Sequence, residues 1–186
     1  MLDERIRGLF DGSCVPTAVI TVGNFFRSDD GVGPFIARNG NPPQPGFFII
    51  DAREHPEAII DHVIAIQPRR IIFIDAADFS GTPGDCRWIA VDAVPQHTLT
   101  THIFPLPAIA AILNHDTNAE VIFLGIQVMD VRYGESLSVP VEQTGMEFIA
   151  LLTQDRIALK SIRHRSPTRP FAQSPSESVD PVLPLR

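Results

Sequence analysis

Long apolar runs are absent from this sequence of 186 residues, and cysteine is scarce, with two residues. No run approaches the roughly 18 apolar residues that a membrane-spanning helix needs, so we expect no membrane insertion. The N-terminal segment MLDERIRGLFDGS alternates charged and apolar residues without a long hydrophobic core, which argues against an export signal. Cys14 and Cys86 stand 72 positions apart and form no C-x-x-C motif, which argues against a zinc knuckle and a thioredoxin-like site. These absences favour a soluble, cytoplasmic protein with two reduced thiols.

An excess of basic residues is also missing. The chain has 15 Lys and Arg against 22 Asp and Glu, which gives a formal net charge of -7 at pH 7. Nucleic acid and anionic lipid would be repelled over most of such a surface, so we expect neither as a partner. With 44% hydrophobic residues, the chain is long enough for one well-buried core and short for two, which predicts a single globular domain.

Several common catalytic and nucleotide-binding motifs do not occur in the sequence. It contains no G-x-G-x-x-G, no G-x-x-x-x-G-K-[ST], no G-x-S-x-G and no H-E-x-x-H. A glycine-rich phosphate loop and acyl transfer by a serine nucleophile are therefore not supported. Five of the six histidines have no motif or strand-end context, so we expect ordinary surface roles for them.

Apolar runs rich in β-branched residues alternate with segments of helical character. Most of these runs have the composition of strands that are buried on both faces of a sheet. The alternation predicts an α/β protein: a single three-layer domain with a mainly parallel, twisted sheet flanked by helices, and with room for an antiparallel strand at one edge. The predicted strands are residues 17–22, 47–50, 70–74, 87–91 and 121–126.

Proline and glycine set the limits of the predicted helices. Residues 38–46 hold three prolines and two glycines, so the helix before them must be short. Further helices are predicted at 56–66, 107–115 and 141 to about 163. We expect the domain to span residues 1–165. Residues 166–186 hold five prolines and four serines and too little apolar content to bury, which predicts a disordered tail.

Polar residues gather at the predicted ends of the strands. In open α/β sheets, ligands bind outside the carboxyl ends of the strands, so these residues are the first candidates for a functional site. They are Asp29 and Asp30 in the motif VGNFFRSDDGVG, Asp51 after the second strand, Asp75 and Asp78 after the third, and His102 in the segment after the fourth.

The acidic pair in the opening motif suits a cation better than a phosphate. Two adjacent carboxylates would repel an anion, whereas Gly31 and Gly33 would let the chain turn tightly around a metal. The alternative is that Asp29 or Asp30 caps a short helix that begins near Val32. Asp75 and His102 have ordinary alternatives as turn and loop residues. Together, two carboxylates and an imidazole at one edge would suit a divalent metal such as nickel, manganese or zinc.

The segments GNFFRSDDGVGP, IIFIDAADFSGTPG, TTHIFPLP and EVIFLGIQ, in this order within residues 19–127, resemble the hydrogenase maturation endopeptidases, particularly the type that serves the formate-hydrogenlyase hydrogenase. The resemblance implies a helix-flanked α/β fold and a protease that removes a C-terminal extension from the large-subunit precursor of a nickel-iron hydrogenase after nickel insertion. By motif position it implies Asp30, Asp75 and His102 as metal ligands and catalytic residues. It also implies that the nickel belongs to the substrate, although another divalent metal could occupy the isolated protein.

The second strand departs from the pattern of that family. Members usually have two glycines after the aspartate of this strand, whereas this chain has Ala52 and Arg53 after Asp51. A β-carbon and a long cation would narrow or repolarise a substrate groove. Arg53 could pair with a substrate carboxylate or with Asp51, or it could point into solvent.

Two other functions fit the same residues. A nickel-sensing or chaperone module would bind metal without hydrolysis, and a flavodoxin-like nucleotide-binding domain would use the same edge of the sheet. For a protease, the metal would polarise the scissile carbonyl or activate water, and the sequence does not choose between these roles. Asp78 is a candidate partner of the metal ligands or general base, with capping of the strand end as the alternative.

Overall fold

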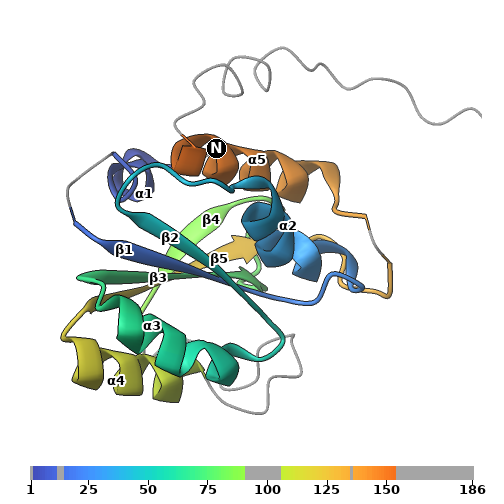
Figure 1. Cartoon of the computed structure of the whole chain (residues 1–186). Helices are drawn as coiled ribbons and strands as arrows, with labels where there is room; N and C mark the ends of the chain where they lie inside the picture. The colour runs from blue at the N-terminus through green and yellow to red at the C-terminus, as the bar shows by residue number, and fades with distance from the viewer. Residues whose placement is uncertain (1, 12–14, 91–105, 135, 154–186) are drawn as a thin grey trace, which may run out of the picture.

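The structure is a computed structural model that describes residues 2–11, 15–90, 106–134 and 136–153 (Figure 1). The predicted tail at 166–186 lies outside these residues. None of the helices in the described ranges is long and apolar enough to cross a membrane.

Five strands form one mixed sheet in the order β2-β1-β3-β5-β4. The first four strands in this order run parallel, and β4 pairs antiparallel with β5 at the edge. This confirms the predicted α/β class and its antiparallel edge strand. The strands are β1 (Thr17–Val22), β2 (Phe47–Arg53), β3 (Arg70–Ala77), β4 (Cys86–Ile89) and β5 (Glu120–Gln127).

Helices cover both faces of the sheet and complete the three layers (Figure 1). On one face lie α1 (Glu4–Gly8), α2 (Val32–Asn39) and α5 (Val139–Thr153). On the other face lie α3 (Ile60–Ile66) and α4 (Leu106–Thr117). Side chains of β1 alternate between the two cores, with Val19 in the first and Ile20 in the second, because successive residues of a strand point to opposite faces.

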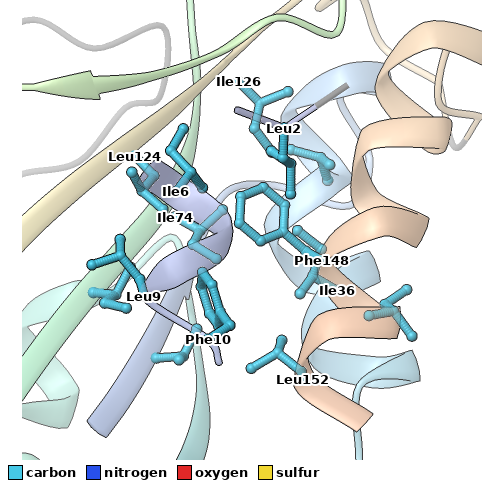
Figure 2. Packing of buried hydrophobic residues seen from close by; sticks show 14 of the residues in the cluster. Leu2, Ile6, Leu9, Phe10, Ile36, Ile74, Leu124, Ile126, Phe148 and Leu152 are labelled. Atoms are coloured by element: carbon cyan, nitrogen blue, oxygen red, sulfur yellow. The ribbon is translucent and has the colours of Figure 1, made fainter. Parts of the chain in front are cut away.

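The N-terminal segment has a structural role that the sequence analysis missed. Asp3 caps α1, since one of its carboxylate oxygens accepts a hydrogen bond of 2.8 Å from the backbone N–H of Ile6. Leu2, Ile6 and Phe10 pack between the sheet and α5, as Figure 2 shows. Arg7 forms an ion pair with Glu147 of α5, which holds this short helix in place.

The expectation of strands buried on both faces is confirmed for β1 and β3 and is wrong at the edges of the sheet. All six residues of β1 are buried. In β2, however, Phe48 is 43% exposed, and in β4, Trp88 is 37% exposed. The composition of a short apolar run does not reveal whether its strand lies in the centre or at an edge.

Several predicted element boundaries also shift. β3 continues to Ala77 because its ladder with β5 extends to that residue, and Asp75 therefore lies within the strand and not after it. The helix predicted at 56–66 is split into the 3-10 helix η2 (Pro56–Ile59) and α3. α2 is short, as predicted, with eight residues. α5 starts at Val139, and residues 154–163 of the predicted helix lie outside the described part of the chain.

Candidate active site at the carboxyl edge of the sheet

Asp75 provides a buried carboxyl group in the central strand of the sheet. Its residue is 7% exposed, and its Oδ1 accepts a hydrogen bond of 2.8 Å from the backbone N–H of Ala76. Its Oδ2 is buried and has no hydrogen-bond partner among the described residues. Desolvation, and then the nearby negative charge of Asp30, raise the pKa of Asp75 to about 8. At neutral pH this group therefore retains its proton.

Asp30 provides a second buried carboxyl group close enough to interact with Asp75. It lies in the 3-10 helix η1 (Ser28–Gly31) and is 1% exposed. Its Oδ2 accepts a hydrogen bond of 3.0 Å from the backbone N–H of Asn24, whereas its Oδ1 is buried without a partner in the described part of the chain. Desolvation raises the pKa of Asp30 to about 6, against the lowering effects of the Asn24 N–H and Arg27.

Two glycines allow the opening motif to reach this position. A β-carbon on Gly23, whose φ is +136°, would lie 2.0 Å from the backbone oxygen of Asp30. A β-carbon on Gly33 would lie 2.0 Å from the backbone oxygen of Val22. Both distances are far below van der Waals contact, so only glycine lets the end of β1 and the start of α2 approach so closely. This close approach brings Asp30 over the edge of the sheet.

Asp29 has a different role from its neighbour. Its Oδ2 accepts hydrogen bonds from the backbone N–H groups of Met129 and Asp130 and from the hydroxyl of Ser138, at 2.8, 3.0 and 2.9 Å. Its Oδ1 accepts a fourth bond, of 2.6 Å, from the backbone N–H of Ser138. Asp29 therefore fastens the loop after β5 to η1, and its oxygens are already engaged by the protein.

The alternative that one aspartate caps the helix after the motif is wrong. The N-cap residue of α2 is Gly31, and this end of the helix has no side-chain capping hydrogen bond. Capping therefore does not explain the acidic pair. The two aspartates have separate roles, because Asp29 anchors a loop whereas Asp30 keeps one buried oxygen without a partner in the described part of the chain.

Asp51 and Arg53 pair with each other at the exposed rim. Asp51 Oδ1 accepts a hydrogen bond of 3.1 Å from the backbone N–H of Arg53, and the Arg53 Nε lies 3.5 Å from Asp51 Oδ2. Arg53 has a φ of +51°, a left-handed conformation that favours glycine. The register with β1 shifts at this point, where Thr21 pairs with Asp51 and Val22 pairs with Arg53. Arg53 thus occupies a backbone position that the glycines of typical family members would adopt with less strain.

Asp78 lies in a turn beyond β3 and is solvent-exposed. Its Oδ1 accepts hydrogen bonds from the backbone N–H of Ser80 at 3.0 Å and from Nε2 of Gln127 at 3.1 Å. These hydrogen bonds lower the pKa of Asp78, which makes it a weaker base. Its contacts fit the strand-end alternative better than a part in proton transfer.

His102 lies outside the described residues. Within the described ranges, no group of three or more His, Cys, Asp and Glu side chains is arranged to hold a metal ion. The two aspartates nevertheless fit a cation, because each has a buried oxygen without a partner among the described residues and buried polar atoms are normally satisfied. A divalent ion would compensate the desolvation of Asp30 and favour the ionised form of Asp75.

Asn24 is a site residue that the sequence analysis missed. Besides its backbone contact to Asp30, its Nδ2 donates a hydrogen bond of 2.6 Å to Glu54, and its Oδ1 accepts one of 2.8 Å from the backbone N–H of Phe26. Asn24 therefore connects the carboxylate of Asp30 with the segment that follows β2. Its place directly after the glycine at the end of a strand is the signal that could have identified it.

The fold is that of the hydrogenase maturation proteases. A crystal structure of a hydrogenase 3 maturation protease superposes with a TM-score of 0.66 and 31% identity, and covers 75% of this chain and 90% of that one. A [NiFe] hydrogenase maturation protease from Thermococcus kodakarensis KOD1 has the same fold, with a TM-score of 0.64 and 24% identity over 86% of this chain and 97% of that one.

Sequence comparisons define the family more closely. The model of the HycI hydrogenase maturation protease family matches residues 36–155. The hydrogenase 3 maturation protease of Escherichia coli (strain K12) is 33% identical over 126 residues, which cover 67% of this chain and 80% of that protein. This chain belongs to the hydrogenase maturation protease family, and the resemblance inferred from the motifs is confirmed.

Proposed function

We propose that this protein is the endopeptidase that removes the C-terminal extension from the large-subunit precursor of a nickel-iron hydrogenase after nickel insertion. Family membership supports peptidase activity in hydrogenase maturation. The observation that carries the finer proposal is the pair of buried carboxylate oxygens, Asp30 Oδ1 and Asp75 Oδ2, that lack partners in the described part of the chain.

The two aspartates recognise a nickel ion that the precursor already holds. Asp30 and Asp75 supply two oxygen ligands, and His102, whose place in the motif TTHIFPLP corresponds to that of the family histidine, supplies a nitrogen. Because Asp75 has a pKa of about 8, it loses its proton when it engages the metal. The protein carries the metal only while the precursor is bound, so nickel is part of the substrate.

Recognition of the metal makes cleavage conditional on nickel insertion. A precursor without nickel offers the three ligands nothing to coordinate, so its scissile bond is not held at the site. In the hydrolysis itself, a water oxygen bonds to the scissile carbonyl carbon, the carbon–nitrogen bond breaks, and the leaving amine takes up a proton. The carboxylates at the edge position the bond for this reaction.

Mass spectrometry of the precursor tests this function. Nickel-loaded and nickel-free precursors are incubated with the wild type and with Asp30→Asn, Asp75→Asn and His102→Ala. We expect loss of the C-terminal peptide only from the nickel-loaded precursor, and a rate at least 100-fold lower with each variant. Asp61→Asn, at an exposed acid of α3, serves as a matched control and should process at the wild-type rate.

Two results would contradict the proposal. If the wild type binds the nickel-loaded precursor but leaves its mass unchanged, the protein is a binding or chaperone module. If the nickel-free precursor is cleaved equally well, coordination of nickel is not the basis of recognition. Nucleotide affinity that survives in Asp30→Asn and Asp75→Asn would favour the nucleotide-binding alternative.

A further inference from the structure

A groove of about 670 Å³ lies beside Asp30 and is not explained by the metal ligands. It is bounded by the segment after β1, by α2 and by the end of β2. Gly23 and Asn24 line it, and the backbone N–H of Asn24 is the group that holds Asp30. The groove therefore borders the segment that holds Asp30, and a polypeptide bound there would pass close to this part of the candidate active site.

One wall of this groove is apolar and exposed. Phe25 and Phe26 are 40% and 49% exposed, and their rings meet edge to face with centroids 5.8 Å apart. Phe26 also stacks on Tyr133 from the loop after β5, at 6.3 Å between centroids. Exposed aromatic side chains grouped beside a groove are typical of binding surfaces.

The acidic side chains in the groove are already engaged within the protein. Glu54 accepts the hydrogen bond from the side-chain amide of Asn24, and Asp51 accepts the backbone N–H of Arg53. These carboxylates serve the local structure of the groove.

Two arginines in the groove present exposed guanidinium groups to a ligand. Arg38 of α2 is exposed and makes no hydrogen bond or ion pair with the described residues. The Arg53 side chain is 79% exposed, and its contact with Asp51 at 3.5 Å is the kind of surface pair that contributes little. In a chain with a net charge of -7, one cation without a described partner and a second held only by a weak surface pair offer counter-charges to acidic groups of a ligand.

We propose that this groove binds an extended, acidic segment of the substrate polypeptide next to the bond to be cleaved. An apolar side chain of the segment packs on Phe25 and Phe26, and its carboxylates pair with Arg38 and Arg53. Arg38 lies about 9 Å along α2 from Val32, a distance that an extended peptide spans in about three residues. The proposal rests on the proposed function and assigns Arg38 and Arg53 a role in substrate specificity.

Steady-state kinetics with the nickel-loaded precursor test this role. The double variant Arg38→Gln/Arg53→Gln should raise KM about tenfold and leave kcat within about twofold, because the two cations bind substrate and transition state alike. Arg69→Gln, at an exposed arginine just before β3 and thus at the opposite end of the sheet, is the matched control and should keep the wild-type KM. Wild-type KM should rise with salt more steeply than that of the double variant.

A substrate variant completes the test. Acidic residues of the precursor near the cleavage point are replaced by Asn and Gln, which should raise KM for the wild type but add little for the double variant, because the same pairs are already lost. Equal KM values for wild type and double variant overturn the groove proposal, as does an unchanged KM with a lower kcat. Melting curves of the double variant verify its folding.

The proposal for the groove and the proposal of protease activity can be refuted independently of each other. If the wild type cleaves nothing, the protease proposal is wrong, and the groove is then tested by the affinity of the uncleaved precursor for wild type and double variant. A Kd that is equal for the two proteins refutes acidic-segment binding. A Kd about tenfold higher for the double variant supports acidic-segment binding without any hydrolysis.

Discussion

Replacement of Asp75 by asparagine tests whether burial keeps this carboxyl group protonated. Asp75 is 7% exposed, and its pKa is raised from 3.8 to about 8 by desolvation first and by Asp30 second. Asparagine is nearly isosteric and keeps the oxygen that accepts the Ala76 N–H, but it cannot ionise. The variant therefore removes the titration while the packing of the strand is retained.

The sign and size of the effect follow from proton linkage. An acid with a higher pKa in the folded chain binds more protons when folded, so its contribution to stability falls as pH rises from 3.8 to about 8. Each pKa unit corresponds to about 1.4 kcal/mol, so the interval from about pH 5 to about pH 8 corresponds to at most about 4 kcal/mol. Relaxation and water entry reduce this ceiling, and we expect a loss of about 2–4 kcal/mol.

Urea unfolding of the metal-free protein across this pH range measures the effect. The free energy of unfolding of the wild type should fall with pH relative to that of Asp75→Asn. Asp30, with a pKa of about 6, is almost fully ionised by about pH 7, so the interval above about pH 7 isolates Asp75. Asp61→Asn is the control and should follow the wild-type curve. Parallel curves for wild type and Asp75→Asn would refute the argument that burial holds the proton.

Two further variants test how the opening motif is held in place. Asp29→Ala removes the acceptor of four hydrogen bonds and should lower the free energy of unfolding by about 2–4 kcal/mol, measured by urea titration; a loss below about 0.5 kcal/mol would show that the loop after β5 does not depend on this side chain. Gly33→Ala places a β-carbon 2.0 Å from a strand carbonyl and should lower stability by at least about 2 kcal/mol, with a matching fall in Tm. Gly8→Ala is its control, because no atom lies within 4 Å of the added carbon, and it should raise stability by about 0.5–1 kcal/mol. Equal melting temperatures for the two glycine variants would contradict the proposed close approach.

The order of strands and helices could be predicted because local patterns specify it. Apolar runs rich in β-branched residues marked all five strands, and the prolines after Asn41 limited the length of α2. The extension of β3 past Asp75 could not be predicted, because it depends on pairing with β5, which is about fifty residues away in the sequence. The core role of the N-terminal segment was missed because five helical residues carry too weak a periodic signal.

The candidate site could likewise be predicted only in part from the sequence. Its acidic residues stood out in the sequence, and the family resemblance selected Asp30 over Asp29 from motif position alone. The physical basis of that choice is tertiary, since Asp29 is occupied by backbone N–H groups from a loop one hundred positions further along the chain. The role of Asn24 and the groove with Arg38 could not be predicted from the sequence either, because both arise from contacts among the segments around β1, α2 and β2.

The amino-acid pattern alone thus determined that this chain is an α/β protein with acidic residues at the ends of its strands, since hydrophobic periodicity and strand-end position are local properties. Only the tertiary structure decided which carboxylate oxygens are buried without a partner among the described residues, because burial and hydrogen bonding depend on segments that meet solely in the folded chain.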